Sequence, residues 1–150
     1  MSINKLLPMR LSLIGLFIVA TLASCKKEKL DINSYWVCNK SLNLDSVAIS
    51  GKIIGLWVWT KQSCFETGET KAANKNINVT FKPDHTFVVN ENTNILSQGT
   101  WKLVLLDNNQ WGFAVPSLSD YLYGRILFCG NEVLFNNSYI DGCDNLFTKE

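Results

Sequence analysis

The sequence predicts an all-β domain built from short antiparallel strands. Apolar and polar side chains alternate over many short segments, as in Ile77 to Phe81, which is the pattern of strands with one buried face. Residues that favour turns separate these segments at short intervals. Apart from one turn near Ser117 to Tyr121, no stretch after the N-terminal segment shows apolar residues at the 3.6-residue period of an amphipathic helix. These three observations together indicate a sheet protein.

The predicted strands follow one another from residue 53 to residue 149, joined mostly by tight turns. Turn signals lie at residues 82–85 and 107–109, at Gly130-Asn131 and at Asp141-Gly142. We expect an eight-stranded antiparallel up-and-down β-barrel, because closure of the sheet removes its exposed edges. A β-sandwich of two sheets is the alternative. The eight expected strands span residues 53–61, 77–81, 86–90, 101–105, 111–115, 123–129, 132–136 and 145–149.

The first 24 residues have the layout of a secretory signal peptide. Lys5 and Arg10 begin it, and the apolar run of residues 11–23 follows. An uncleaved transmembrane anchor is the alternative, but a spanning helix needs about 20 apolar residues. The segment Leu22-Ala23-Ser24-Cys25 resembles a bacterial lipobox. That resemblance implies cleavage before Cys25, acylation of Cys25 with palmitate-type chains, and a lipid anchor in the membrane.

The sequence therefore divides into a signal peptide (1–24), a lipidated hydrophilic tether (25–50) and a β-domain (51–150). Lys5 and Arg10 leave with the signal, so 12 basic side chains face 13 acidic ones in the mature chain. This balance, without a basic stripe, excludes nucleic acid as the expected partner. We expect an outer-membrane lipoprotein of the cell envelope. Its periplasmic or cell-surface face is left open.

Four cysteines remain besides the lipid site. An even number in an oxidising compartment predicts two disulfide bonds, and four cysteines allow three pairings. Zinc is not expected, because spacing of the C-x₂-C type is absent and His85 is the single histidine. The four residues are Cys38, Cys64, Cys129 and Cys143.

Four short motifs resemble the lipocalin-like lipoproteins of gram-negative bacteria. They are Gly55-x-Trp57 in the first strand, Phe81-x-x-Asp84-x-Thr86-Phe87 around a turn, Gly99-Thr100-Trp101, and Asp141-Gly142-Cys143-Asp144 before the last strand. The resemblance covers roughly residues 50 to 150 and implies a closed barrel.

Two positions depart from the pattern of that family. The family turn usually carries Asp-Gly, whereas this chain has Asp84-His85, and histidine is among the residue types that tolerate a positive φ. The family also places an arginine near the end of the last strand, packed across the tryptophan. Lys149 occupies this place, and we expect its ammonium group to cover Trp57 by a cation–π contact.

The resemblance also bears on the disulfide pairing. In a closed barrel the first and last strands are neighbours, and setting Trp57 opposite Lys149 puts Ser63 opposite Cys143, one residue from Cys64. Simple alternation then points the two sulfur atoms to opposite faces, so this pairing requires a bulge or a loop end. The favoured pairs are Cys64–Cys143 and Cys38–Cys129.

Motifs of enzymes are missing from the sequence. There is no Gly-x-Ser-x-Gly elbow, no glycine-rich phosphate loop and no HExxH zinc motif. His85 lies alone in a turn. Asp141 and Asp144 are too few acids for calcium, which needs six or more oxygen ligands. We expect no catalytic residue, no metal and no cofactor.

Aromatic residues recur at alternating strand positions. An eight-stranded barrel is wide enough to hold one small ligand, so these side chains are candidates for the wall of an apolar cavity. The expected function is then non-catalytic binding of a small apolar molecule. The alternative is a filled barrel that serves as an envelope interaction module for a protein or glycan partner. The predicted ligand-binding residues are Trp59, Phe81, Phe87, Trp101, Phe113 and Phe135.

Overall fold

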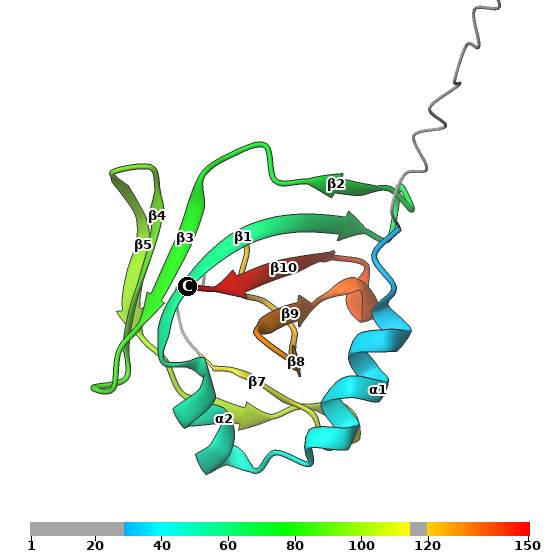
Figure 1. Cartoon of the computed structure of the whole chain (residues 1–150), viewed down its shortest axis with the longest axis horizontal. Helices are drawn as coiled ribbons and strands as arrows, with labels where there is room; N and C mark the ends of the chain where they lie inside the picture. The colour runs from blue at the N-terminus through cyan, green and yellow to red at the C-terminus, as the bar shows by residue number, and fades with distance from the viewer. Residues whose placement is uncertain (1–28, 115–119) are drawn as a thin grey trace, which may run out of the picture.

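A computed structural model of the chain describes residues 29–114 and 120–150, which form a curled antiparallel sheet with two helices beside it (Figure 1). The strands are β1 (Gly55–Cys64), β2 (Thr70–Ala72), β3 (Ile77–Phe81), β4 (Thr86–Glu91), β5 (Asn94–Thr100), β6 (Leu103–Leu105), β7 (Trp111–Phe113), β8 (Arg125–Cys129), β9 (Glu132–Asn136) and β10 (Cys143–Lys149). Hydrogen-bonded neighbours run in the order β5-β4-β3-β1-β10-β9-β8-β7-β6, and β2 pairs with β1.

The prediction of an all-β antiparallel fold is confirmed, but the strands are ten rather than eight among the described residues. No strand was expected at β2 or β5, and β6 begins at Leu103 instead of Trp101. The first and last strands, β1 and β10, pair in the middle of the sheet. Strands β5 and β6 lie at the two ends of the strand order. The strands form one continuous sheet instead of the two sheets of a sandwich.

The inner face of the sheet holds the main core. In β3, Ile77, Val79 and Phe81 are buried while the residues between them are half-exposed, as the alternation predicted. Phe87 and Val89 of β4 face the same side. The remaining strand residues of this core are Trp57, Trp59, Phe113, Ile126, Phe128, Val133, Phe135 and Phe147, joined by Trp101 and Leu122 from the connections.

The predicted turns are present where the structure describes them. His85 has φ 63°, so the histidine takes the left-handed conformation that glycine usually supplies. Gly130, with φ 58°, closes the hairpin between β8 and β9. Asp141 has φ 62° after the short helix η2 (Ser138–Ile140). The expected helical turn near Ser117 to Tyr121 and the lipid site Cys25 involve residues 117–119 and 25, which lie outside the described residues.

Most of the predicted tether, residues 25–50, is folded instead. Helices α1 (Ile32–Leu42) and α2 (Ser46–Ile53) precede β1. The carboxylates of Asp31 and Asp45 cap them, accepting hydrogen bonds from the N–H groups of Ser34 at 3.4 Å and Ala48 at 2.8 Å. The prediction that this part of the chain has no helix was therefore wrong.

Helix α1 covers the outer face of β8, β9 and β10. Leu127, Leu134 and Leu146 point outward from these strands and form a second core with Leu30 and Tyr35. All five residues are buried. This part of the sheet is therefore covered on both faces, which explains the uninterrupted apolar runs at residues 126–128 of β8 and 133–135 of β9.

Both disulfide bonds favoured from the sequence are present, Cys38–Cys129 and Cys64–Cys143. Trp57 pairs with Lys149, and the register of β1 against β10 then shifts between Trp59 and Lys61. The extra residue in β1 brings Cys64 directly opposite Cys143. This is the bulge that the pairing required, because without it the two sulfur atoms would lie on opposite faces.

Candidate functional site

The six aromatic residues predicted to line a ligand cavity lie together and are buried. Ring centres of Phe81 and Phe113 are 5.2 Å apart, and those of Phe81 and Trp101 are 6.1 Å apart. Phe113 in turn lies 5.9 Å from Phe135. Such spacings are typical of aromatic pairs in a packed core. The six residues, Trp59, Phe81, Phe87, Trp101, Phe113 and Phe135, all belong to this one core.

Two of these residues carry a polar atom without a partner. The indole nitrogens Nε1 of Trp59 and Trp101 are buried and make no hydrogen bond within the described residues. By contrast, Trp57 Nε1 donates to the carbonyl oxygen of Ile53 at 2.6 Å. A buried indole N–H normally finds an acceptor, so the interior has an unmet hydrogen-bonding capacity at two points.

The single histidine lies at the edge of this core. The His85 ring lies 4.5 Å from the Trp101 ring, centre to centre, and the His85 carbonyl oxygen accepts the backbone N–H of Trp101 at 2.7 Å. His85 itself is exposed. It therefore covers an indole at the end of the sheet.

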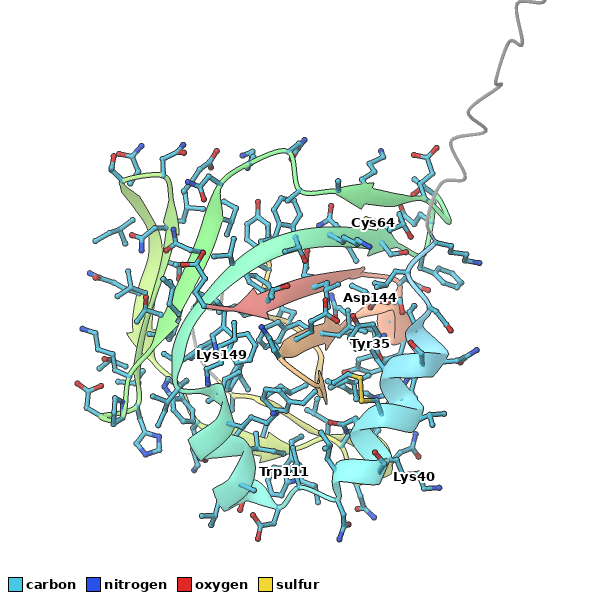
Figure 2. The ribbon with its side chains drawn as sticks, viewed as in Figure 1. Tyr35, Lys40, Cys64, Trp111, Asp144 and Lys149 are labelled. Carbon is cyan, nitrogen blue, oxygen red and sulfur yellow. A yellow bond between two sulfur atoms is a disulfide. The ribbon has the colours of Figure 1, made fainter. Side chains whose placement is uncertain are left out.

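A cleft of about 450 Å³ lies apart from the six predicted residues, and none of them lines it. It forms where α1, the start of α2 and the turn before β7 meet. We call it the α1–β7 cleft. Figure 2 labels Lys40 and Trp111, which belong to its two walls. The lining residues are Trp36, Val37, Asn39, Lys40, Asn43, Leu44, Ile49, Asn109, Gln110, Trp111 and Ile126.

One wall of the cleft is a face of α1 and its C-cap. Trp36, Asn39, Lys40 and Asn43 are spaced at i, i+3, i+4 and i+7, which brings them to one side of the helix. Asn43 ends the helix in the left-handed conformation with φ 46°. An indole, two amides and an ammonium group are thereby presented together.

Three contacts hold this wall against the sheet. The Cys38–Cys129 disulfide bonds α1 to the end of β8. Asn39 Oδ1 accepts the backbone N–H of Phe128 at 2.9 Å. The Tyr35 hydroxyl donates to Glu132 at 2.5 Å, and burial together with this hydrogen bond raises the pKa of Tyr35. The position of α1 is therefore fixed by a covalent bond and two long-range hydrogen bonds.

The opposite wall is the turn that leads into β7. This turn contains the short helix η1 (Asp107–Asn109), and both Asn108 and Asn109 have φ 57°. The N–H of Leu106 donates to the carbonyl oxygen of Gln110 at 2.6 Å and closes the turn. Trp111 follows, half-buried and packed against the inner core. The turn thus sets two amide side chains beside an indole.

Two cations lie at or near the cleft. Among the described residues, Lys40 is the single charged residue of its lining. Beside it, the guanidinium carbon of Arg125 lies 3.7 Å from the ring centre of Tyr139 and 5.6 Å from that of Trp36. Arg125 is thus stacked against the outer wall of the cleft by cation–π contacts.

The acidic pair considered for calcium has a structural role instead. Asp144 is fully buried, and its Oδ1 accepts the N–H groups of Asn137 at 2.7 Å and Ser138 at 2.8 Å. It also accepts Asn136 Nδ2 at 2.9 Å, so one carboxylate oxygen fixes the turn containing η2. Asp141 is exposed. Within the described ranges, no group of three or more side chains is suited to a metal ion.

Sequence reasoning did not identify the α1–β7 cleft. Trp36 and Trp111 are visible in the sequence as aromatic residues, but they lie 75 positions apart. The Asp107-Asn108-Asn109 run was interpreted as a turn only. The cleft exists because α1 folds onto the sheet, and α1 itself was not predicted.

Comparison with known proteins supplies no family for this chain. No family model matches it, and neither a curated protein nor a solved structure matches it. In the part of the chain that the structure describes, every helix is too short or too polar to span a membrane. The geometry of the α1–β7 cleft and of the aromatic core therefore carries the functional argument.

Proposed function

We propose that this protein is a non-catalytic recognition module of the bacterial envelope, anchored through a lipid on Cys25. In this proposal the curled sheet is a filled, lipocalin-like barrel, and the partner is bound outside it, in the α1–β7 cleft. One observation carries the proposal: the interior aromatic rings pack on one another, while the cleft presents two indoles and four amides at the surface.

The position of the cleft suits an anchored protein. The described chain starts at Lys29, and at most about 14 Å of extended chain separate it from Cys25. The N-terminal end of α1 therefore stays near the membrane. The cleft is lined by the later turns of α1, and Figure 1 shows this end of the helix pointing away from the start of the described chain. In an anchored molecule, the cleft would therefore face away from the membrane.

The side chains that could support catalysis are engaged elsewhere. His85 is stacked on Trp101, and Asp144 is buried under three hydrogen bonds. Among the residues that the structure describes, the cleft lining has one ammonium group and no carboxylate, imidazole or thiol. Paired acid and base groups are therefore missing from its lining. This composition supports binding rather than bond cleavage.

A second candidate function is the carrier function predicted first, in which the barrel interior holds a small ligand. The two buried indole N–H groups of Trp59 and Trp101 favour it, because an interior ligand with an acceptor atom would complete them. Such a ligand would have to separate rings that now lie 5.2–6.1 Å apart.

Native mass spectrometry of the protein purified from its own host separates the two functions. For the recognition module, we expect the mass of the processed chain alone. In parallel, the released domain is titrated onto isolated envelope fractions. We expect saturable binding that Trp111→Ala weakens at least tenfold and Trp59→Phe leaves unchanged. The carrier function would be supported if the parent retains an apolar ligand, seen as added mass, and Trp59→Phe loses it. If envelope binding is also insensitive to Trp111→Ala, the recognition module is refuted.

A further inference from the structure

The lining of the α1–β7 cleft specifies the chemistry of its partner more closely. Its apolar floor comes from Ile49 and Ile126, both buried. Trp36 and Trp111 stand half-buried on opposite walls. The cleft volume of about 450 Å³ falls within the range of small-ligand sites, about 300–1,000 Å³. The site is therefore built for a ligand of limited size with at least one flat apolar face.

The polar groups of the cleft are mostly amides. Asn43 and Asn109 are exposed and make no side-chain hydrogen bond within the described residues. Asn39 Oδ1 accepts the backbone N–H of Phe128, so the Nδ2 hydrogens of Asn39 remain available to a ligand. Gln110 Nε2 donates to the carbonyl oxygen of Asn108, so Gln110 Oε1 remains available as an acceptor. The cleft thus offers both donors and acceptors on uncharged groups.

We propose that the α1–β7 cleft binds a saccharide, a deepening that rests on the recognition function proposed above. A sugar ring has an apolar C–H face that packs on an indole, and hydroxyl groups that donate and accept at its edge. Amides match such hydroxyls because one amide carries a donor and an acceptor side by side. Lys40 adds a further donor, which also suits an acidic substituent on the sugar.

Other ligand classes fit this lining less well. A purely apolar ligand would bury Asn39 Nδ2, the Asn43 amide and Gln110 Oε1 without hydrogen-bond partners, which is unfavourable. A phosphate-rich ligand would meet a single lining cation, Lys40, instead of a cluster. A saccharide uses the indoles, the amides and the ammonium group together.

Backbone conformation supplies clean variants for the test. Asn43 and Asn109 have φ 46° and 57°, which glycine adopts without strain. Asn43→Gly and Asn109→Gly therefore remove an amide while preserving the helix end and the turn. Asn92→Gly is the matched control, because Asn92 is exposed, has φ 56° and lies in the β4–β5 turn away from the cleft.

The experiment uses isothermal titration of the processed full chain with chitobiose, cellobiose, mannobiose, lactose and digalacturonate. We expect at least one of these probes to bind with a 1:1 ratio. Asn43→Gly and Asn109→Gly should each weaken that binding about tenfold, Trp111→Phe less than Trp111→Ala, and Asn92→Gly not at all. If the binding of digalacturonate requires Lys40 and the binding of the other four probes does not, an acidic sugar is identified as the preferred ligand.

Failure of the saccharide inference can be distinguished from failure of the recognition module. If envelope binding depends on Trp111 while none of the five saccharides binds or competes, the saccharide inference fails and the recognition module stands with a protein partner. If Trp111→Ala leaves envelope binding intact, both proposals fail.

Discussion

Lys149 lies across Trp57, with its Nζ 5.1 Å from the centre of the indole ring. The same Nζ donates to the carbonyl oxygen of Lys52 at 2.8 Å, so the last strand is tied to α2 as well. Gly55 makes room for the lysine stem: a Cβ at this position, where φ is 130°, would lie 2.9 Å from Lys149 Cε. Gly55 and Trp57 of the Gly-x-Trp motif thus both contact the side chain of Lys149 in the last strand.

Loss of the Lys149 ammonium group should destabilise the domain. We expect Lys149→Met to lower the free energy of unfolding by about 1–2 kcal/mol, because it removes a cation–π contact and a hydrogen bond while keeping most of the stem. Urea denaturation at neutral pH measures the change. Lys149→Arg is the control and should lose less than half as much. Equal losses in both variants would contradict a role for the positive charge.

The Cys38–Cys129 disulfide should stabilise α1 more than the rest of the fold. Replacing both cysteines by serine should cost about 2–4 kcal/mol, since the bond closes a long loop in the unfolded chain. Hydrogen exchange should then increase first at residues 32–42. The matched control is the double serine variant of Cys64 and Cys143, which joins two paired strands. Unchanged exchange in α1 of the first variant would refute the assignment.

Asp84 should make stability sensitive to acid. The hydroxyl and the N–H of Thr86 donate to its Oδ1 at 2.6 and 2.9 Å, and these hydrogen bonds lower the pKa of Asp84. Because the folded-state pKa lies below the unfolded one, this contribution is present at neutral pH and is lost as pH falls through the folded pKa. Asp84→Asn should therefore flatten the fall in Tm below about pH 4.

The measurement for Asp84 is a series of thermal melts from pH 7 to pH 2.5. Asp107→Asn serves as the control, because Asp107 is exposed and its side chain makes no hydrogen bond within the described residues. A steeper acid dependence in Asp84→Asn than in the parent would show that the sign is reversed.

Cys25 should carry the lipid. In cells fed a clickable palmitate analogue, we expect label on the parent chain and none on Cys25→Ala, because the thiol is the acylation site in the lipobox interpretation. Equal labelling of both chains would contradict that interpretation. Cys129→Ser serves as the control and should retain the label, since Cys129 is bonded to Cys38 in the folded domain.

Local patterns were sufficient for most of the strands and for the turns that join them. Alternation placed β3 and β4, and turn chemistry placed the turns at His85, Gly130 and Asp141. The Lys149 contact and the Cys64–Cys143 pair followed from the resemblance, which sets the first strand beside the last, and Cys38–Cys129 followed as the remaining pair. The strands and turns, by contrast, are encoded in spacings of two residues or in residue types that few backbone conformations accept.

The helices, β2 and β5 were not predicted. The apolar residues of α1 and α2 are spread around each helix and give no clear helical period, although the caps Asp31 and Asp45 were legible. The uninterrupted apolar triplets at 126–128 and 133–135 also signalled that something covers the outer face of β8 and β9. Strand β5 is mostly exposed, so it lacks the alternation that marks a half-buried strand.

The sequence by itself determined the class of the fold, because alternation and turn chemistry act between residues that are close along the chain. Only the tertiary structure decided where the candidate ligand site lies. The α1–β7 cleft joins Trp36, Asn109 and Ile126 from three distant segments. Its existence depends on the packing of α1 against Leu127 and Leu134, a long-range burial that no local pattern specifies. The packing of α1 that covers the outer face of the sheet therefore also creates the candidate site.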